Sequence, residues 1–564
     1  MAEAIKETKS QRIERLKREK NAWECLDEIR AFARDGHGAI PPEWLGTYFR
    51  FWGVYTQGDG GGAVGGTGGE GKSVPYFMVR IRIPNGLLRA DQVRAIAHVA
   101  ARYARGSADI TVRQNIQLHW VTIEDLPEVL DALWRVGLTT MGSCGDDVRN
   151  ITGCPLAGVD ADEVYDASPL VSEANQHFVG NPEFYNLPRK FKICITGCHV
   201  WCSYPEINDV GFTAVWRNRN EIGFSLRVAG GLSTEPHLAR QLNAFVFPNQ
   251  VLPVLRAIAS IFRESDGLRE NRERARLKFL FLKHGWTAEK FLSELQARLG
   301  FELAPAIPDE APDDVYRDHV GVHRQKQAGY YYVGASVLRG RISAAQLNAA
   351  AELSERYAWG ELRTTNMQNL LFINVPERNA AKLAGELHLA ELPTEGSPFR
   401  RGIIACSGTE FCKIAITETK SFGRWLAEEL DERLPGFEQH LKLHITGCPN
   451  SCGQHWIADI GLEGKKIKHN GQLIDAYYFC VGGAVGKHQS IARPVGYRCP
   501  AFEVPDALER LLKRYLLARD PDENLRQFFG RHSPDQIRGY LAGGDVVAID
   551  RDPAAGRVPH GVEG

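Results

Sequence analysis

The 564-residue sequence lacks several features that would each place it in a broad class of protein. It has no strong net charge, because its formal charges sum to −1, so the composition does not favour nucleic acid as a partner. It has no run of about 18 apolar residues, so no membrane span is expected. With 43% hydrophobic and 24% charged residues, the composition is that of an ordinary globular protein.

The N-terminus also lacks a secretory signal. Residues 1–24 mix charges of both signs without an apolar core, and we expect a solvated helix there. Twelve cysteines in a chain without such a signal point to metal binding or catalysis rather than to disulfides. The cytoplasm is therefore the expected compartment.

An internal repeat organises the chain. Residues 102–106 (RYARG) reappear as residues 356–360 (RYAWG), an offset of 254, and Gln114-Asn115 reappears as Gln368-Asn369 at the same offset. Around both copies the pattern is strand, helix, strand, strand and helix, which is typical of a ferredoxin-like half-module.

The repeat continues into cysteine-bearing motifs. Residues 149–154 match residues 401–406 at an offset of 252, and residues 192–198 match residues 442–448 at an offset of 250. We therefore predict an α+β fold from an internally duplicated chain. Two ferredoxin-like half-modules would form one pseudo-symmetric domain, accompanied by two related α/β domains that carry the cysteine motifs.

The predicted boundaries follow the two copies. Residues 265–320 are expected to be a helical and then Pro-rich connector, and the Gly-rich run at 58–72 a mobile loop. The predicted segments are an N-terminal arm with that loop (1–75), the first half-module (76–145), the first motif domain with the connector (146–320), the second half-module (321–399), the second motif domain (400–545) and a C-terminal tail (546–564).

Four cysteines of the second copy form the strongest chemical signal. Cys406 and Cys412 are separated by five residues, and Cys448 and Cys452 by three. Structural zinc usually binds tighter Cys-x2-Cys pairs, because each sulfur must lie about 2.3 Å from one ion. A [4Fe–4S] cluster is larger and can take its thiolates from two separate loops. Inert core thiols are the remaining alternative, which four cysteines in Gly- and Pro-bearing loops disfavour.

The first copy retains only part of this pattern. Cys154, Cys198 and Cys202 match three of the four cysteines, but Asp160 lies near the place of Cys412. We therefore predict one complete cluster site and one degenerate copy. A second metal site built on Cys194, Cys198 and Cys202 remains open.

The first copy instead carries cations in apolar or loop settings. Buried cations are costly unless they are paired, so a convergent set would form an anion site. At the matching positions the second copy has Gly334 in place of Arg80 and Met367 in place of Arg113. This complementarity predicts one composite site between the halves, with cations from the following residues: Arg80, Arg113, Arg149, Arg189, Lys190 and Lys192.

The motifs ACSGTEFCK and TGCPNSC resemble those of the sirohaem-dependent nitrite and sulfite reductases, and the likeness extends over about residues 49 to 540. The resemblance implies one sirohaem and one [4Fe–4S] cluster. It implies that the cluster ligands are Cys406, Cys412, Cys448 and Cys452, with Cys452 also bridging to the sirohaem iron. It further implies that substrate is contacted by Arg80, Arg149, Lys190 and Lys192, and the sirohaem by Arg113, Arg189 and Asn450.

The resemblance also bears on donor and substrate. No G-x-G-x-x-G motif opens a βαβ unit and no flavin domain is evident, so reduced ferredoxin is the expected donor. Stretches such as GDDVRN and EFCKIAITETK are most like ferredoxin–nitrite reductases, which implies reduction of nitrite to ammonia in nitrate assimilation by a monomeric enzyme.

Two alternatives stay open. Lys192 is the residue of the sulfite-reducing branch, which keeps reduction of sulfite to sulfide as the second hypothesis. Tyr76 and Cys144 occupy positions that are cross-linked in some sulfite-reducing relatives, but we expect ordinary packing roles. A non-catalytic sensor or carrier is the third hypothesis, and the cations weigh against it because a carrier needs no anion site.

Overall fold

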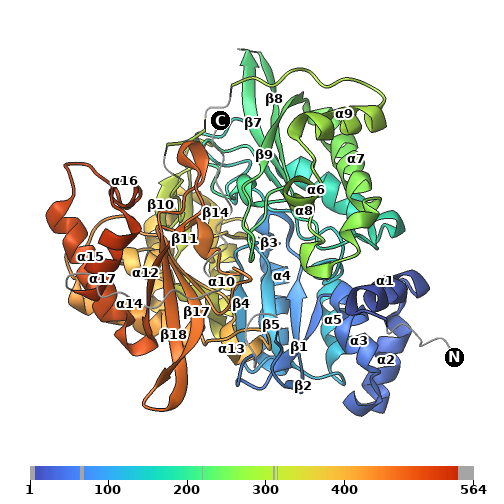
Figure 1. Ribbon diagram of the computed structural model, residues 1–564, viewed down its shortest axis with the longest axis horizontal. Helices are drawn as coiled ribbons and strands as arrows, with labels where there is room; N and C mark the ends of the chain where they lie inside the picture. The colour runs from blue at the N-terminus through green and yellow to red at the C-terminus, as the bar shows by residue number, and fades with distance from the viewer. Residues whose placement is uncertain (1–6, 64–68, 219, 309–310, 314, 544–564) are drawn as a thin grey trace.

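The computed structural model describes residues 7–63, 69–218, 220–308, 311–313 and 315–543. The chain forms two central sheets and two outer domains, so the predicted α+β fold with duplicated half-modules is confirmed (Figure 1). The predicted tail at 546–564 lies outside the described residues.

The two central sheets exchange a strand. The first sheet has the order β1-β2-β5-β4-β12 and the second the order β10-β11-β14-β13-β3, so each contains one short strand from the other repeat. This exchange ties the half-modules into one pseudo-symmetric unit. The first sheet comprises β1 (Val54–Gly58), β2 (Ser73–Ile81), β5 (Ile116–Val121), β4 (Ser107–Ile110) and β12 (Arg341–Ser343). The second comprises β10 (Gly321–Arg324), β11 (Tyr330–Ala335), β14 (Leu370–Pro376), β13 (Glu361–Thr364) and β3 (Leu87–Arg89).

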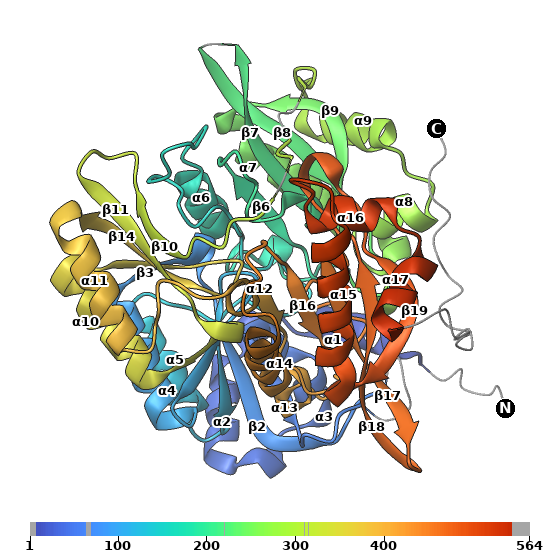
Figure 2. The same cartoon turned by 90° about the vertical axis from the view of Figure 1, so that its left-hand side faces the viewer.

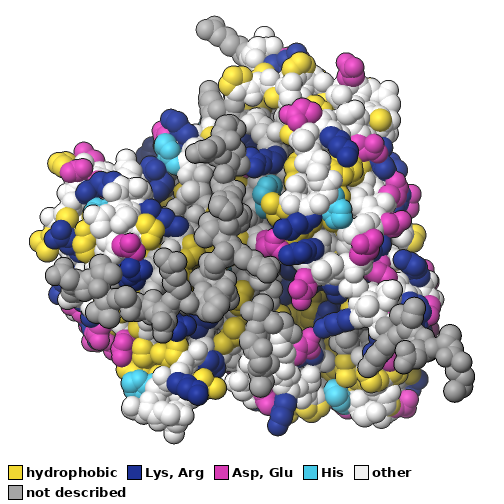
Figure 3. Space-filling model, viewed as in Figure 1, with side chains coloured by type: hydrophobic (Ala, Val, Ile, Leu, Met, Phe, Trp, Pro, Cys, Tyr) yellow, Lys and Arg dark blue, Asp and Glu magenta, His cyan; other side chains and the backbone are white. Residues whose placement is uncertain are grey.

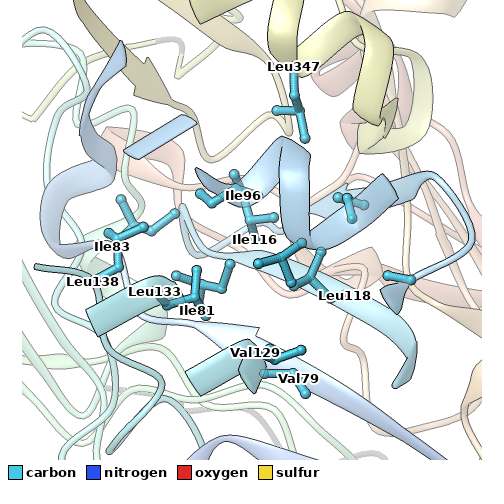
Figure 4. Close-up of a cluster of buried hydrophobic side chains, with 14 of the residues drawn as sticks. Val79, Ile81, Ile83, Ile96, Ile116, Leu118, Val129, Leu133, Leu138 and Leu347 are labelled. Carbon is cyan, nitrogen blue, oxygen red and sulfur yellow. The ribbon is translucent and has the colours of Figure 1, made fainter. Parts of the chain in front are cut away.

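Helices cover these sheets and form the core between them. Helix α4 (Ala90–Tyr103) packs against its repeat mate α10 (Ala344–Tyr357), with α5 (Leu126–Trp134) and α11 (Glu377–Leu389) beside them (Figure 2). Figure 4 shows Ile81 and Ile116 of the first sheet facing Ile96 of α4 and Leu133 of α5, while Leu347 of α10 points toward the same cluster. All five are fully buried, so hydrophobic burial holds the repeats together.

The repeated glutamines lock the halves by matching hydrogen bonds. Gln114 donates to the Thr364 carbonyl (3.3 Å) and Gln368 donates to the Ile110 carbonyl (2.9 Å). Gly86 has a φ of +72°, and a Cβ there would meet the Thr364 oxygen at 2.3 Å, so the close approach requires glycine. The Gln-Asn motif that revealed the duplication is thus structural.

The first outer domain is built on a four-stranded sheet in sequence order. It comprises β6 (Ile193–Thr196), β7 (Val210–Asn218), β8 (Glu221–Val228) and β9 (Arg240–Val246). Its helices are α6 (Ser168–Phe178), α7 (Val251–Arg263), α8 (Lys278–Lys283) and α9 (Ala288–Leu299), which are green to teal at the upper right of Figure 1.

The second outer domain repeats this plan with one more strand. Its sheet comprises β15 (Ile403–Ala405), β16 (Leu443–Thr446), β17 (Ile460–His469), β18 (Gln472–Val481) and β19 (Arg493–Pro500). Its helices are α12 (Pro398–Gly402), α13 (Gly408–Phe411), α14 (Lys420–Arg433), α15 (Val504–Ala518), α16 (Leu525–Arg531) and α17 (Pro534–Ala542). The two outer domains also share a hydrogen bond at matching positions. Lys192 N donates to Asp209 (2.8 Å) in the first domain, and Lys442 N donates to Asp459 (2.7 Å) in the second.

The N-terminal arm begins with a helix that is solvated on one face and packed on the other. The arm comprises α1 (Lys9–Glu19), α2 (Leu26–Asp35) and α3 (Pro42–Gly46). On α1, Arg12, Arg15 and Arg18 are exposed, as expected of a solvated helix. The Lys17 ammonium on the other face is buried, 3.4 Å from an Asp146 carboxylate oxygen and 2.9 Å from the Leu187 carbonyl.

The described ends of the Gly-rich segment are also fixed. Ala63 N donates to the Ala415 carbonyl (2.7 Å) and Gly71 N to the Lys413 carbonyl (2.6 Å). A Cβ at Gly62, whose φ is +76°, would lie 2.8 Å from Thr409 Cγ2. The expected mobile loop thus docks on the loop after Cys412, while its residues 64–68 lie outside the described part.

The surface does not single out a partner. Figure 3 shows basic and acidic side chains interspersed over one face, as the balanced charge predicts. No helix within the described ranges is both long and apolar enough to cross a membrane.

Candidate functional site

The four cysteines of the second outer domain come from two neighbouring parallel strands. Cys406 directly follows β15, Cys412 follows the short helix α13, and Cys448 and Cys452 lie in the turn after β16. Strands β15 and β16 pair in parallel, so their carboxyl ends share one edge of the sheet. Ligand-binding residues collect at such an edge in open α/β sheets.

The four thiols act on one another. Burial, together with the charges of Cys452 and Cys406, raises the pKa of Cys412 to about 12. Burial likewise raises the pKa of Cys448, with added contributions from Cys452, Cys406 and Cys412. Thiolates gathered in this way require a compensating positive charge, which a bound metal centre supplies.

The spacing of these thiols suits a body larger than one ion. Across the described residues, one group of three or more Cys, His, Asp or Glu ligand atoms lies within 4.8 Å of one another, and it is Cys154, Cys198 and Cys202. No three of the second-domain thiols lie within that distance of one another. Two backbone or amide donors support them, since Gly447 N donates to Cys406 Sγ (3.2 Å) and Asn450 Nδ2 to Cys448 Sγ (3.6 Å).

Two half-buried lysines of the first outer domain influence one another, and one of them, Lys190, also interacts with a thiol of the second outer domain. The pKa of Lys190 is lowered to about 7 by burial and by Arg189 and Arg276, while the Cys452 thiolate opposes the shift. Burial, with Arg113 and Lys190, lowers the pKa of Lys192 well below its usual value. Within the described part of the chain neither ammonium has a hydrogen-bond or ion-pair partner.

Cys452 is the thiol open to this side. It is exposed, whereas Cys448 is buried and Cys406 and Cys412 are half-buried. The Cys452 thiolate opposes the lowering of the Lys190 pKa, so a group of the second outer domain interacts electrostatically with one of the first. The thiolate of one repeat thus acts on the charge of Lys190 in the other.

The predicted arginines divide into two kinds. Arg80 donates to Cys144 Sγ (3.1 Å) and to Gln117 Oε1 (3.3 Å), and Arg113 donates to Asn208 Oδ1 (2.6 Å). These partners are neutral, and burial lowers the pKa of Arg113 to about 9.

The other two arginines have acidic neighbours. Arg149 lies 3.3 Å from a carboxylate oxygen of Asp147, and Arg189 lies 3.0 Å from Asp146. Burial lowers the pKa of Arg189 to about 10. Their orientation is therefore fixed by the protein itself.

Sequence reasoning missed Arg276. It forms a buried ion pair with Asp209 (2.7 Å) and lowers the pKa of both Lys190 and Lys192. It lies in the basic run RENRERARLK of the predicted connector, which packs into the first outer domain. The run of basic residues is the sequence feature that indicates Arg276, but the predicted cation set included only residues of expected strands and nearby loops.

Direct contacts close the two outer domains around the site. Ser233 Oγ donates to Asn450 Oδ1 (3.4 Å), and Trp456 Nε1 donates to the Ser233 carbonyl (3.0 Å). Farther along, Gly486 N donates to Glu206 Oε1 (2.6 Å). Asn450, predicted to contact a cofactor, thus lies at the domain interface.

Tyr76 and Cys144 have separate surroundings. Tyr76 packs edge-on against Trp120 with ring centroids 5.4 Å apart, while Cys144 accepts a hydrogen bond from Arg80. Tyr55 is the tyrosine beside Arg80, with its ring 5.9 Å from the guanidinium carbon.

Comparisons with known proteins agree with this arrangement. The family model described as nitrite and sulphite reductase 4Fe-4S domain matches residues 144–303 and 396–527. The model described as nitrite/sulfite reductase ferredoxin-like half domain matches residues 70–135 and 323–390. Both models match twice, in the order that the duplication predicts.

Whole-chain relatives carry both names. The chain is 37% identical to an assimilatory ferredoxin-dependent nitrite reductase of Haloferax mediterranei, over 91% of this chain and 90% of that protein. It is 36% identical to sulfite reductase [ferredoxin] 2 of Mycolicibacterium paratuberculosis, over 90% of this chain and 92% of that protein. The solved structure of the Mycobacterium tuberculosis NirA protein is 34% identical and covers 93% of this chain and 97% of its own, with a TM-score of 0.89. The chain therefore belongs to the nitrite and sulfite reductase family, a family of oxidoreductases.

Proposed function

We propose that the protein reduces nitrite to ammonia with six electrons from reduced ferredoxin. The observation that carries the proposal is the pair of half-buried lysines, Lys190 and Lys192, without partners among the described residues, of which Lys190 interacts with the exposed thiol of Cys452. A small anion bound there gains charge-assisted hydrogen bonds that the protein does not supply internally. A sensor or carrier has no need of such cations.

The family implies a [4Fe–4S] cluster and sirohaem, and the residues present fit both. The cluster would be held by Cys406, Cys412, Cys448 and Cys452, whose mutual effect on their pKa values calls for a cationic centre larger than one ion. The carboxylates of sirohaem would be held by Arg113 and Arg189, with Asn450 beside them, and Cys452 would bridge the two groups. Arg113 Nε is buried without a hydrogen-bond partner, as expected of a donor reserved for a ligand. When bound, these groups supply the electron transfer and the reductive chemistry.

The chain's own residues bind the anion and supply protons. Arg80 and Arg149 are held by fixed neighbours and remain charged, so they orient the oxyanion. Lys190 is the better proton donor, because a pKa of about 7 lets it release a proton near neutral pH.

Sulfite reduction to sulfide is the second candidate. Lys192 adds a second unpaired ammonium, and two cations suit the dianionic sulfite better than the singly charged nitrite. Nitrite is favoured by the overall likeness to ferredoxin–nitrite reductases, which includes 37% identity to the enzyme of Synechococcus elongatus over 91% of this chain. The names of both groups of relatives support ferredoxin as the donor.

Steady-state kinetics with both anions test the proposal. The holoenzyme would be purified anaerobically and assayed with reduced ferredoxin, and kcat/KM would be measured for nitrite and for sulfite. We expect the larger value for nitrite, with ammonia as its product. A larger value for sulfite would replace the first candidate by the second, and turnover of neither anion would contradict both.

A further inference from the structure

Three thiols of the first outer domain form a compact cluster. The Sγ atoms of Cys154, Cys198 and Cys202 all lie within 4.8 Å of one another, and Cys198 and Cys202 are 3.6 Å apart. All three side chains are buried, at 1% to 3% exposure. They come from the loop after the bridge between Thr152 and Cys194 and from the turn after β6.

This spacing suits a single ion. Thiolates about 2.3 Å from one tetrahedral zinc ion lie roughly 3.8 Å from one another. An iron–sulfur cubane holds its cysteines farther apart, because each one binds a different iron atom. The three-thiol cluster and the four-cysteine site of the second domain therefore have different geometries, although they occupy matching positions.

The fourth cysteine of the pattern is replaced by a residue that is already paired. Asp160 forms an ion pair with Arg317, with oxygen and nitrogen 2.6 Å apart. A carboxylate held in this way is not free to complete the cluster. The ligand must come from elsewhere.

His319 lies outside this group. It is 4% exposed and neither ring nitrogen has a hydrogen-bond partner, but no ring nitrogen lies within 4.8 Å of all three thiols. The surroundings of the thiols are apolar, since Tyr332, Leu371 and Ile373 of the second central sheet pack on them.

We propose that Cys154, Cys198 and Cys202 bind one zinc ion as a structural site and supply three of its four ligands. The zinc would stabilise the repeat that has lost the cluster, on the face where it packs against the second central sheet. Cys194, the residue that sequence reasoning grouped with Cys198 and Cys202, is not a member. Cys194 lies in β6, and its Sγ is 3.1 Å from Ser203 Oγ. The third thiol of the cluster is that of Cys154.

Metal analysis of the holoenzyme tests the proposal without reference to turnover. We expect stoichiometric zinc that survives dialysis, and X-ray absorption at the zinc edge dominated by three sulfur ligands at about 2.3 Å. Absence of zinc from a protein expressed with zinc present would overturn the proposal. So would iron, or a Cys198–Cys202 disulfide, at these thiols.

Variants assign the ligands. Cys198→Ser should lose the zinc, while the matched control Cys194→Ser, which alters another buried thiol of the same region, should keep it. Cys412→Ser should lose cluster iron and keep the zinc, so failure of this proposal is distinguishable from failure of the proposed function.

A measurement on the unaltered protein covers the case in which Cys198→Ser does not fold. Titration with an organomercurial reagent, followed by a zinc-sensitive dye, should release the zinc as these thiols are modified. Zinc that stays bound after all thiols have reacted would contradict thiolate coordination.

Discussion

The turns after β6 and after β16 have one backbone plan and two chemistries. The turn after β16 carries an exposed Cys452 and thiols that interact at a distance, beside a cation-rich partner domain. The turn after β6 carries Cys198 and Cys202 at 3.6 Å, buried among apolar side chains. Position in the fold is shared, and the difference lies in spacing, exposure and neighbours.

The two repeats of the duplicated fold supply different chemical groups. One composite site uses sulfur from the second repeat and cations from the first, so each repeat could lose what the other supplies. The unused counterpart in the first repeat kept three thiols but became closed to solvent. The predictions below test this difference between the two turns.

Removal of a thiol from the turn after β16 should have the largest effect. Cys448→Ser should lose the cluster and with it all measurable turnover, because the remaining three thiols cannot hold the cubane. Iron and labile sulfide analysis, an optical spectrum and an assay would record the change. Cys194→Ser is the control and should keep both; a Cys448→Ser variant with normal iron and turnover would contradict the assignment.

Loss of the arginine that supports the cations should destabilise the first outer domain. Arg276→Ala leaves the Asp209 carboxylate buried and unpaired, which costs about 3 to 5 kcal/mol in the free energy of unfolding. Denaturant unfolding would measure it. In the control Arg94→Ala, which breaks an exposed pair with Glu355, the loss should stay under about 1 kcal/mol. Equal losses in the two variants would refute the structural role of Arg276.

The second lysine should set the choice of anion. Lys192→Asn removes one unpaired cation, so kcat/KM for sulfite should fall about tenfold relative to that for nitrite, a difference of roughly 1.4 kcal/mol in the transition state. Parallel assays of the two anions would reveal it. A fall for nitrite alone would remove Lys192 from the specificity argument.

The pH dependence should be the smallest effect. Since the pKa of Lys190 is lowered to about 7, the ammonium is charged below that pH and neutral above it, and KM for nitrite should rise as pH increases through about 7. Lys190→Arg should flatten this rise. The folded state also binds fewer protons than the unfolded state between about pH 7 and 10.5, so the contribution of this group to stability increases with pH there. A KM independent of pH would contradict the shift.

The sequence was sufficient for the duplication and the family, because both rest on ordered local motifs. It was not sufficient for the exchange of β3 and β12, since strand pairing between distant segments leaves no local pattern. Nor could it place Arg276 or dock the Gly-rich segment on the Cys412 loop, because both depend on contacts across domains.

The cysteines show the same limit. The motif spacing predicts that the four thiols of the second repeat form one site, and in the structure Cys452, Cys406 and Cys412 contribute to the raised pKa of Cys448. In the first repeat, spacing suggested Cys194 as a partner of Cys198 and Cys202. Tertiary structure instead brings Cys154 to Cys198 and Cys202.

Nitrite binding to the Lys190→Ala holoenzyme tests the central claim most directly, namely that cations of one repeat and sulfur of the other form one site. Optical titration with nitrite would be compared with that of the unaltered enzyme and of Lys290→Ala, an exposed lysine on α9. The account predicts an intact cluster spectrum and nitrite affinity at least about tenfold weaker in Lys190→Ala only. Unchanged affinity in that variant would contradict the composite site.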